Sequence, residues 1–233
     1  MYIPHWLLRF ATVLTIATIH SAAFAASLVS EDFMVKSADA GIEIFVRNKR
    51  PADMKTFRAE RTVLYVHGAT YPAHTAFDLK LGDQSWMDYI ASHGYDVYLL
   101  DLRGYGKSTR PAEMSQDAKN NPPIVRGDTA VKDIGTAVDF ILARRGLSKL
   151  TLLGWSWGST LMATYSTQNA GKVARLVLYA PPWIRETPSL VTAGAGPLGA
   201  YRTVSRDQAL GRWLTGVPES KKSALIPAGW FEA

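Results

Sequence analysis

The sequence predicts an α/β protein: a mostly parallel sheet with an antiparallel hairpin at its N-terminal side and helices on both faces. Three observations support this fold class. Apolar segments of strand length alternate with amphipathic segments of helical period, polar turns separate the two kinds, and 47% of the 233 residues are hydrophobic against 20% charged. Such alternation is typical of parallel sheets whose strands are connected by helices.

The first elements are expected to be strands. Residues 33–36 and 42–47 flank the turn-rich stretch 37–41, a pattern that predicts an antiparallel hairpin. Residues 62–67 follow as a continuous, largely apolar run. A run of this kind suits a strand that is buried on both faces of a sheet.

A short helix is expected next, over residues 85–93. Trp86, Tyr89 and Ile90 would form its apolar face, and Gly94 would end it. Helical spacing of the apolar residues places them on one side.

Three further strands are expected over residues 95–102, 150–155 and 173–180. All three are largely apolar, and residues 95–102 suit a strand that is buried on both faces. Residues 173–180 are expected to lie at an apolar edge of the sheet, which would favour aggregation.

Two longer helices separate these strands. The first is expected to be capped by Asp128 and ended by Gly146, and the second spans residues 157–168. Apolar residues keep a helical period along the first: Val131, Ile134, Val138, Ile141 and Leu142.

The N-terminal segment differs from the rest in composition. It carries one charge, Arg9, then an apolar run at residues 10–19 and the small-residue site 23–25. These features predict a secretory signal peptide over residues 1–25 that is cleaved after Ala25. The apolar run is too short to form a stable membrane-spanning helix. We therefore expect a secreted or periplasmic protein.

Two regions are expected after the signal peptide. Residues 26–182 would form the α/β core, and residues 183–233, rich in Gly and Pro, would form a lid or cap. No convincing apolar strand follows residue 180.

Composition also excludes some functions. The absence of cysteine rules out thiol catalysis, iron–sulfur clusters and cysteine zinc sites, and no metal or organic cofactor is implied. The net charge of +6 includes a basic run at residues 47–61, which we interpret as a solvated edge rather than a nucleic-acid site.

The strongest chemical signal is Gly154-Trp155-Ser156-Trp157-Gly158, which fits G-x-S-x-G between a strand and a helix. A sharp turn there exposes the Ser156 hydroxyl above a helix N-terminus, where developing negative charge is stabilised. Ser156 is therefore the candidate nucleophile, and a serine nucleophile indicates acyl transfer.

Two further motifs follow expected strands: His67-Gly68-Ala69-Thr70, and the segment DLRGYGKS at residues 101–108. Together with the serine motif, in this order, they resemble the α/β-hydrolase fold superfamily, which includes esterases, lipases and iminopeptidases. The resemblance covers roughly residues 33–182.

The resemblance implies roles for individual residues. Ala69 and Trp157 would donate the backbone N–H groups of the oxyanion hole to a substrate attacked by Ser156. His67 would support its loop, and Asp101 and Arg103 would brace the loop beside the serine.

The resemblance also implies a histidine base and a carboxylate after the serine, and two further strands. All five histidines precede Ser156. We therefore expect a C-terminally truncated chain of a secreted serine hydrolase that acts on a small-molecule ester or related acyl substrate.

Two alternatives stay open. One is a non-catalytic binding protein, or an inactive fragment, with the same fold. The other is a peptidase like the proline iminopeptidases, whose serine motif is similar, although their HGGPG loop is replaced here by residues 67–70.

Overall fold

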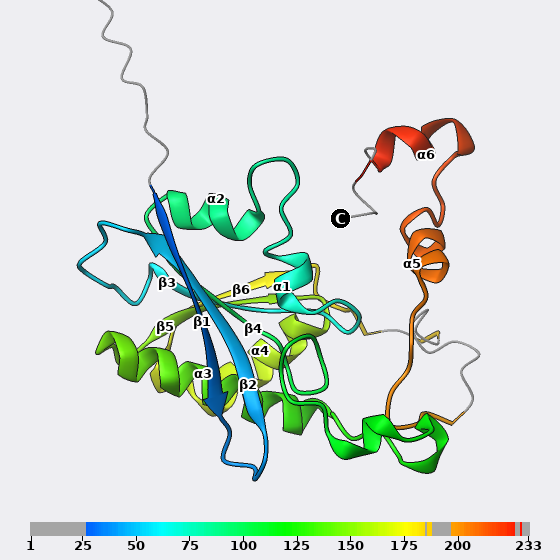
Figure 1. Cartoon of the computed structure of the whole chain (residues 1–233), viewed down its shortest axis with the longest axis horizontal. Helices are drawn as coiled ribbons and strands as arrows, with labels where there is room; N and C mark the ends of the chain where they lie inside the picture. The colour runs from blue at the N-terminus through cyan, green and yellow to red at the C-terminus, as the bar shows by residue number, and fades with distance from the viewer. Residues whose placement is uncertain (1–26, 185, 188–196, 227–228, 230–233) are drawn as a thin grey trace, which may run out of the picture.

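Six strands form one sheet in the order β1-β2-β4-β3-β5-β6 in the computed structural model, which describes residues 27–184, 186–187, 197–226 and 229 (Figure 1). The strands are β1 (Leu28–Lys36), β2 (Glu43–Pro51), β3 (Thr62–Val66), β4 (Asp96–Leu100), β5 (Leu150–Trp155) and β6 (Val173–Tyr179). β1 pairs antiparallel with β2, and β2 with β4, whereas β4, β3, β5 and β6 are parallel. This confirms the predicted fold class. The predicted signal peptide lies outside the described residues.

Helices cover both faces of the sheet and continue beyond it. They are α1 (Ala73–Ala76), α2 (Trp86–Ser92), α3 (Gly127–Arg145), α4 (Trp157–Gln168), α5 (Arg206–Trp213) and α6 (Glu219–Leu225), with short 3-10 turns η1 (Ala112–Ser115), η2 (Ala118–Asn120) and η3 (Ala170–Lys172). Figure 1 shows α5 and α6 beyond the carboxyl ends of the parallel strands.

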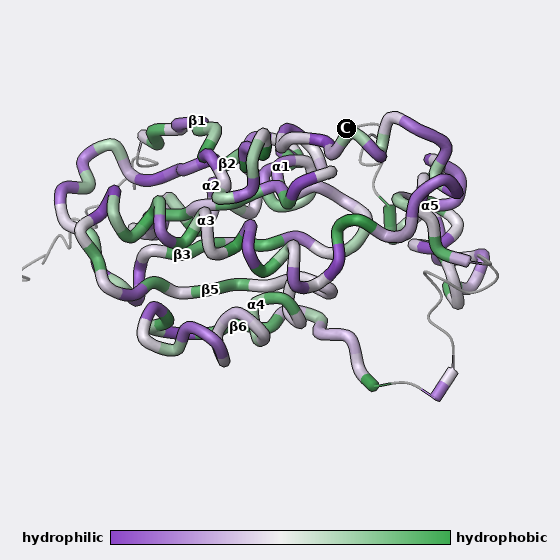
Figure 2. Tube along the Cα trace, turned by 90° about the horizontal axis from the view of Figure 1, so that it is seen from below, coloured by the Kyte–Doolittle hydropathy of each residue, from purple (hydrophilic) through white to green (hydrophobic). Residues whose placement is uncertain are grey.

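The sheet has a hydrophobic core on each face because successive side chains of a strand point in opposite directions. Leu64 and Val66 of β3 join the core formed with α3 and α4. Val63 and Tyr65 of the same strand join the core with Phe77 and the buried residues of α2. Figure 2 shows hydrophobic residues along β3 and β5, in the middle of the sheet.

Two details of the helices differ from the predictions. The cap of α3 is Arg126 and makes no side-chain hydrogen bond, while Asp128 lies inside the first turn, where a carboxylate still favours the helix dipole. The buried face of α2 carries Met87 and Ala91. Trp86 and Tyr89 are 42% and 52% exposed, because α2 turns Met87 and Ala91 toward the core instead.

The expectation of a solvated edge at residues 47–61 is wrong for its first part. β2 is an inner strand, and Lys49 is only 7% exposed. Its Nζ lies 2.6 Å from Asp78 Oδ1 and 2.6 Å from Asp88 Oδ1. The carboxylates that pair with this lysine lie 29 and 39 residues later in the sequence, so the local charge pattern does not reveal them. Lys55 in the following loop is exposed, as expected.

β6 is the outer strand on one side of the sheet in the described part of the chain. Its residues 176–179 are all apolar, and their side chains are 38–51% exposed. An exposed apolar strand edge of this kind favours association with other strands.

None of the helices in the described ranges combines the length and apolar character needed to cross a bilayer.

The ion pair between Asp32 and Arg47 predicts a pH effect. Two hydrogen bonds of 2.7 Å from Arg47 lower the pKa of Asp32 below its ordinary value of 3.8. A carboxylate with a lowered folded-state pKa stabilises the fold above its unfolded pKa, and this stabilisation is lost as pH falls through the folded pKa. We expect the free energy of unfolding to fall less steeply below about pH 4 in Asp32→Asn than in the parent chain.

Urea unfolding at several pH values, followed by circular dichroism, measures this slope. Asp53→Asn is the matched control, since Asp53 is exposed and forms no ion pair in the described structure. Parallel pH profiles for the parent and Asp32→Asn would contradict the prediction.

Candidate active site

Ser156 joins β5 directly to α4 in an unusual backbone conformation. Its φ is 52° and its ψ is −119°. Only one other described non-glycine residue, Ala180, has a positive φ. Such a conformation costs energy and persists only where the surrounding structure enforces it. The turn leaves the Ser156 side chain half-buried at the N-terminus of α4.

The two glycines of the motif allow this turn for steric reasons. A Cβ on Gly154 would lie 2.6 Å from the carbonyl carbon of Gly158 and 2.8 Å from Cα of Ser159. A Cβ on Gly158 would lie 2.7 Å from the carbonyl oxygen of His67. These contacts are with backbone, so no side-chain rotation relieves them. α4 therefore packs against β5 and β3 at a distance that only glycine permits.

Hydrogen bonds to the ends of β5 and β6 stabilise the turn. The Ser156 N–H donates to the carbonyl oxygen of Tyr179 at 2.9 Å. The buried Ser159 hydroxyl lies 2.8 Å from the Gly154 carbonyl oxygen and 3.1 Å from that of Tyr179. The end of β6 is thus part of the support of Ser156.

The loop after β3 lies against Ser156. A Cβ on Gly68 would be 3.1 Å from Ser156 Cβ and 3.6 Å from Ser156 Oγ. Ala69 follows directly, and its carbonyl oxygen accepts a 3.0 Å hydrogen bond from the Tyr105 hydroxyl. Trp157 is the first residue of α4, so its N–H belongs to the first-turn amides that have no acceptor within the helix. The structure thus brings Ser156, Ala69 and Trp157 into one neighbourhood.

His67 is a buried structural residue. Its Nε2 accepts the Leu102 N–H at 3.1 Å, which assigns the ring proton to Nδ1, and Nδ1 donates to the Gly68 carbonyl oxygen at 2.6 Å. Burial lowers the pKa of His67 and favours this neutral form. Both ring nitrogens are engaged, so His67 holds the loop, as the sequence indicates.

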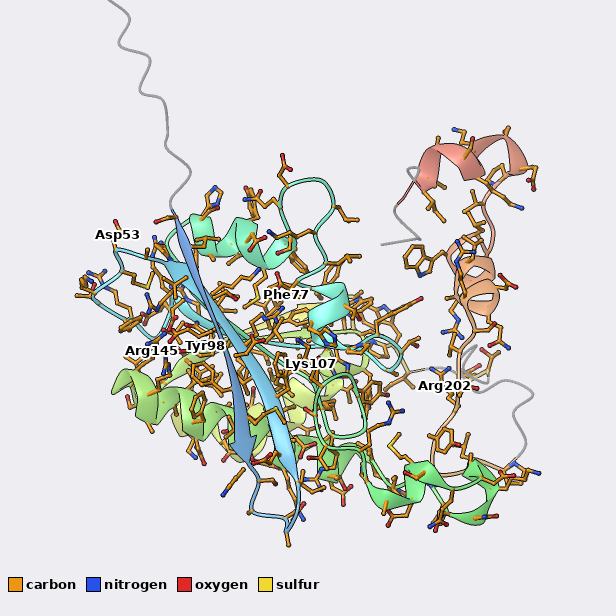
Figure 3. All side chains as sticks on the ribbon, viewed as in Figure 1. Asp53, Phe77, Tyr98, Lys107, Arg145 and Arg202 are labelled. Carbon is orange, nitrogen blue, oxygen red and sulfur yellow. The ribbon has the colours of Figure 1, made fainter. Side chains whose placement is uncertain are left out.

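Asp101 and Arg103 also have bracing contacts. The fully buried Asp101 binds the His74 ring, with 2.7 Å between its Oδ2 and Nδ1, and accepts the Lys107 N–H at 3.1 Å. Arg103 binds Asp133 of α3 through both its guanidinium and its backbone N–H. Figure 3 labels Lys107 on the loop that these contacts support.

Sequence reasoning did not identify Asp133 and Tyr105 as supports of the site. Asp133 is three residues after Ala130 and four before Ala137, so it lies on the buried face of α3. An acid at that spacing within an apolar face is a signal of a buried partner, here Arg103.

Aromatic side chains surround the serine turn. Tyr71 stacks on Trp155, with ring centroids 6.4 Å apart, and its ring lies 6.2 Å from that of Trp213 on α5. Tyr71 therefore links the strand before Ser156 to the helix beyond the sheet.

The described residues contain no group of three or more His, Asp or Glu side chains arranged to hold a metal ion. In the same part of the chain, the Ser156 hydroxyl has no hydrogen bond to a histidine. The three described histidines are His67, His74 and His93, and the last binds the Tyr89 carbonyl oxygen at an exposed helix end.

Comparison with known proteins places this geometry in a family. The chain is 28% identical over 125 residues to gastric triacylglycerol lipase of Mus musculus, which is 52% of this chain and 32% of that lipase. It is 26% identical over 132 residues to lipase member N of Mus musculus, which is 57% of this chain and 33% of that protein. The chain thus spans about a third of the length of these curated relatives.

Solved structures agree on the fold. An epoxide hydrolase from Solanum tuberosum superposes with a TM-score of 0.50 at 20% identity, covering 70% of this chain and 43% of that one. Residues 61–212 match the sequence profile of the alpha/beta hydrolase fold. The chain therefore belongs to the alpha/beta hydrolase fold family.

Proposed function

We propose that this protein is a serine hydrolase that cleaves an ester or related acyl bond through an acyl-enzyme on Ser156. The observation that carries the proposal is the strained backbone of Ser156, with a φ of 52°. Gly154 and Gly158 flank it, and neighbouring backbone atoms leave no room for a Cβ at either glycine. Strain enforced in this way is characteristic of functional sites. The two lipase relatives support hydrolysis of an acyl bond.

In the proposed reaction the Ser156 oxygen attacks the carbonyl carbon of the substrate. The N–H groups of Ala69 and Trp157 stabilise the negative charge that develops on the carbonyl oxygen. The N-terminus of α4 adds the positive end of its helix dipole. The bond to the leaving group then breaks, and the leaving group departs with the proton that the Ser156 hydroxyl has lost. Water next hydrolyses the acyl-enzyme, which gives the free acid and restores the Ser156 hydroxyl.

We further propose that the protein acts outside the cytoplasm. The single early charge, the apolar run and the small-residue site of residues 1–25 support export, and cleavage would follow Ala25.

A binding protein without catalysis is the second candidate. The observation that favours it is the absence of any histidine hydrogen bond to the Ser156 hydroxyl within the described residues, because a serine without a base is a weak nucleophile.

Labelling with a fluorophosphonate probe separates the two candidates. We expect covalent labelling of the Ser156 peptide in the intact chain, seen by mass spectrometry, and none in Ser156→Ala. Removal of the nucleophile in serine hydrolases lowers kcat by several orders of magnitude. The rate of p-nitrophenyl acetate hydrolysis by Ser156→Ala should therefore fall by a similar factor relative to the parent chain.

Ser166→Ala is the matched control. Ser166 lies on the same helix, and its hydroxyl binds the Met162 carbonyl oxygen, so this variant should label as the parent does. A folded parent chain that is not labelled at Ser156 would overturn the proposal and favour the binding role.

A further inference from the structure

Two arginines from the C-terminal part of the chain contact the loop beside Ser156. Arg202 Nη2 lies 3.1 Å from Thr70 Oγ1 and 3.4 Å from the Ala69 carbonyl oxygen. Arg212 Nη1, from α5, lies 3.5 Å from the same Thr70 hydroxyl. Figure 3 labels Arg202 on the segment that runs from the core region to α5. Residues more than 130 positions apart in the sequence thus place two positive charges at one loop.

Within the described residues, the groups that these two guanidinium groups contact on the loop are neutral. Neither Arg202 nor Arg212 forms an ion pair with a carboxylate in the described part of the chain. Arg47, Arg103 and Arg145, in contrast, all bind at least one carboxylate. Arg212 is moreover half-buried, where an uncompensated charge is costly. Two adjacent unneutralised cations favour an anionic ligand, since the guanidinium fork matches a carboxylate in shape and charge.

An aromatic surface adjoins the two charges. Tyr71 follows Thr70 directly and contacts both Trp155 and Trp213. Trp213 in turn follows Arg212 on α5. A ligand at this position would meet ring faces beside guanidinium groups, which suits a molecule with an apolar body and a negatively charged end.

We infer that Arg202 and Arg212 form an anion subsite next to Ser156, and that the substrate is an acyl ester that carries a free carboxylate. The subsite lies beside the serine because Gly68, two residues before Thr70, packs against Ser156. The substrate assignment rests on the proposed serine hydrolase function, whereas the anion subsite is tested by binding alone.

The test uses the Ser156→Ala chain, in which an ester ligand binds without turnover by the serine. Monobenzyl adipate carries one carboxylate, and benzyl methyl adipate is its uncharged counterpart. Their affinities are measured by the change in tryptophan fluorescence and by calorimetry. We expect the monoester to bind at least roughly tenfold more tightly than the diester, with a preference that weakens as salt is added.

Charge variants identify the residues responsible. Arg202→Gln with Arg212→Gln keeps amide donors for Thr70 but removes both charges, so the preference for the monoester should disappear. Arg202→Lys with Arg212→Lys keeps the charges and should keep most of the preference. Arg58→Gln is the control, because Arg58 is exposed and precedes β3, at the opposite end of the strand from the serine loop. Thermal unfolding verifies that each variant is folded.

Equal affinity for the two adipates, or a preference that survives the double glutamine change, would overturn the inference. A preference in binding without fluorophosphonate labelling of the parent chain would refute the hydrolase function but support the subsite. Labelling of Ser156 with no preference for the carboxylate would support the hydrolase function but refute the subsite.

Discussion

Replacement of Gly158 by alanine is expected to lower the free energy of unfolding by about 3 kcal/mol, because the added methyl group collides with backbone. The new Cβ would lie 2.7 Å from the His67 carbonyl oxygen and 3.0 Å from the Val66 carbonyl carbon. Both atoms belong to the end of β3 and the loop after it. Since neither can rotate away, α4 and β3 must separate, and the core between them loosens.

Urea unfolding followed by circular dichroism measures this loss, and fluorophosphonate labelling should fall with it. Gly211→Ala is the matched control, because a Cβ there has no atom within 4 Å and Gly211 lies inside α5. Alanine at such a helical position is expected to be neutral or stabilising by up to about 1 kcal/mol. A Gly158→Ala chain as stable as the parent would show that the close packing is not required.

The second large effect is expected for Arg103→Ala, which should cost about 3–5 kcal/mol because it leaves a buried carboxylate without its partner. Asp133 has no exposed surface, and its Oδ1 lies 2.6 Å from Arg103 Nη2 and 2.9 Å from Arg103 Nε. Asp39, the other acid at Arg103, is more than a third exposed and would be rehydrated.

The loss in Arg103→Ala should depend on pH. Burial raises the pKa of Asp133 even with Arg103 present. A carboxyl group with a raised folded-state pKa stabilises the fold at low pH, and this contribution is lost as pH rises through that pKa. The deficit of the variant should therefore be larger near pH 7 than near pH 4, where the neutral acid needs no counter-charge.

Lys172→Ala is the control for a surface ion pair, since Lys172 and its partner Asp139 have 40% and 60% exposed side chains. Its cost should stay below about 1 kcal/mol. A cost for Arg103→Ala no greater than for Lys172→Ala would contradict the assigned role of the pair. Replacing Arg103 and Asp133 together by leucine should recover part of the stability, because no buried charge is then left unpaired.

Local patterns predicted the strands and the serine turn well. β3, β5 and α4 lie where the apolar runs and the spacing of residues 62–67, 150–155 and 157–168 indicate. Gly146 ends α3 in a left-handed conformation, with φ of 62°, as its position after the last apolar residue indicates. These features depend on neighbours within about one turn or one strand, so a single sequence contains their signal.

Features that depend on distant partners were not predicted. The hydrophobic pattern of α2 predicted a buried face with Trp86 and Tyr89, whereas the helix buries Met87 and Ala91. Lys49 is neutralised by Asp78 and Asp88, which no local pattern connects to β2. Side chains of this kind acquire their environment only when separate elements pack.

The same division applies to the candidate site. The motif around Ser156 was determined by the sequence itself, since a strand, two glycines and a helix within a few residues dictate the turn. The position of Arg202 and Arg212 at Thr70 was decided only by the tertiary structure. Backbone conformation at a tight turn is a local steric property, whereas charges from the C-terminal segment reach the serine loop only because the chain folds back across the carboxyl ends of the strands.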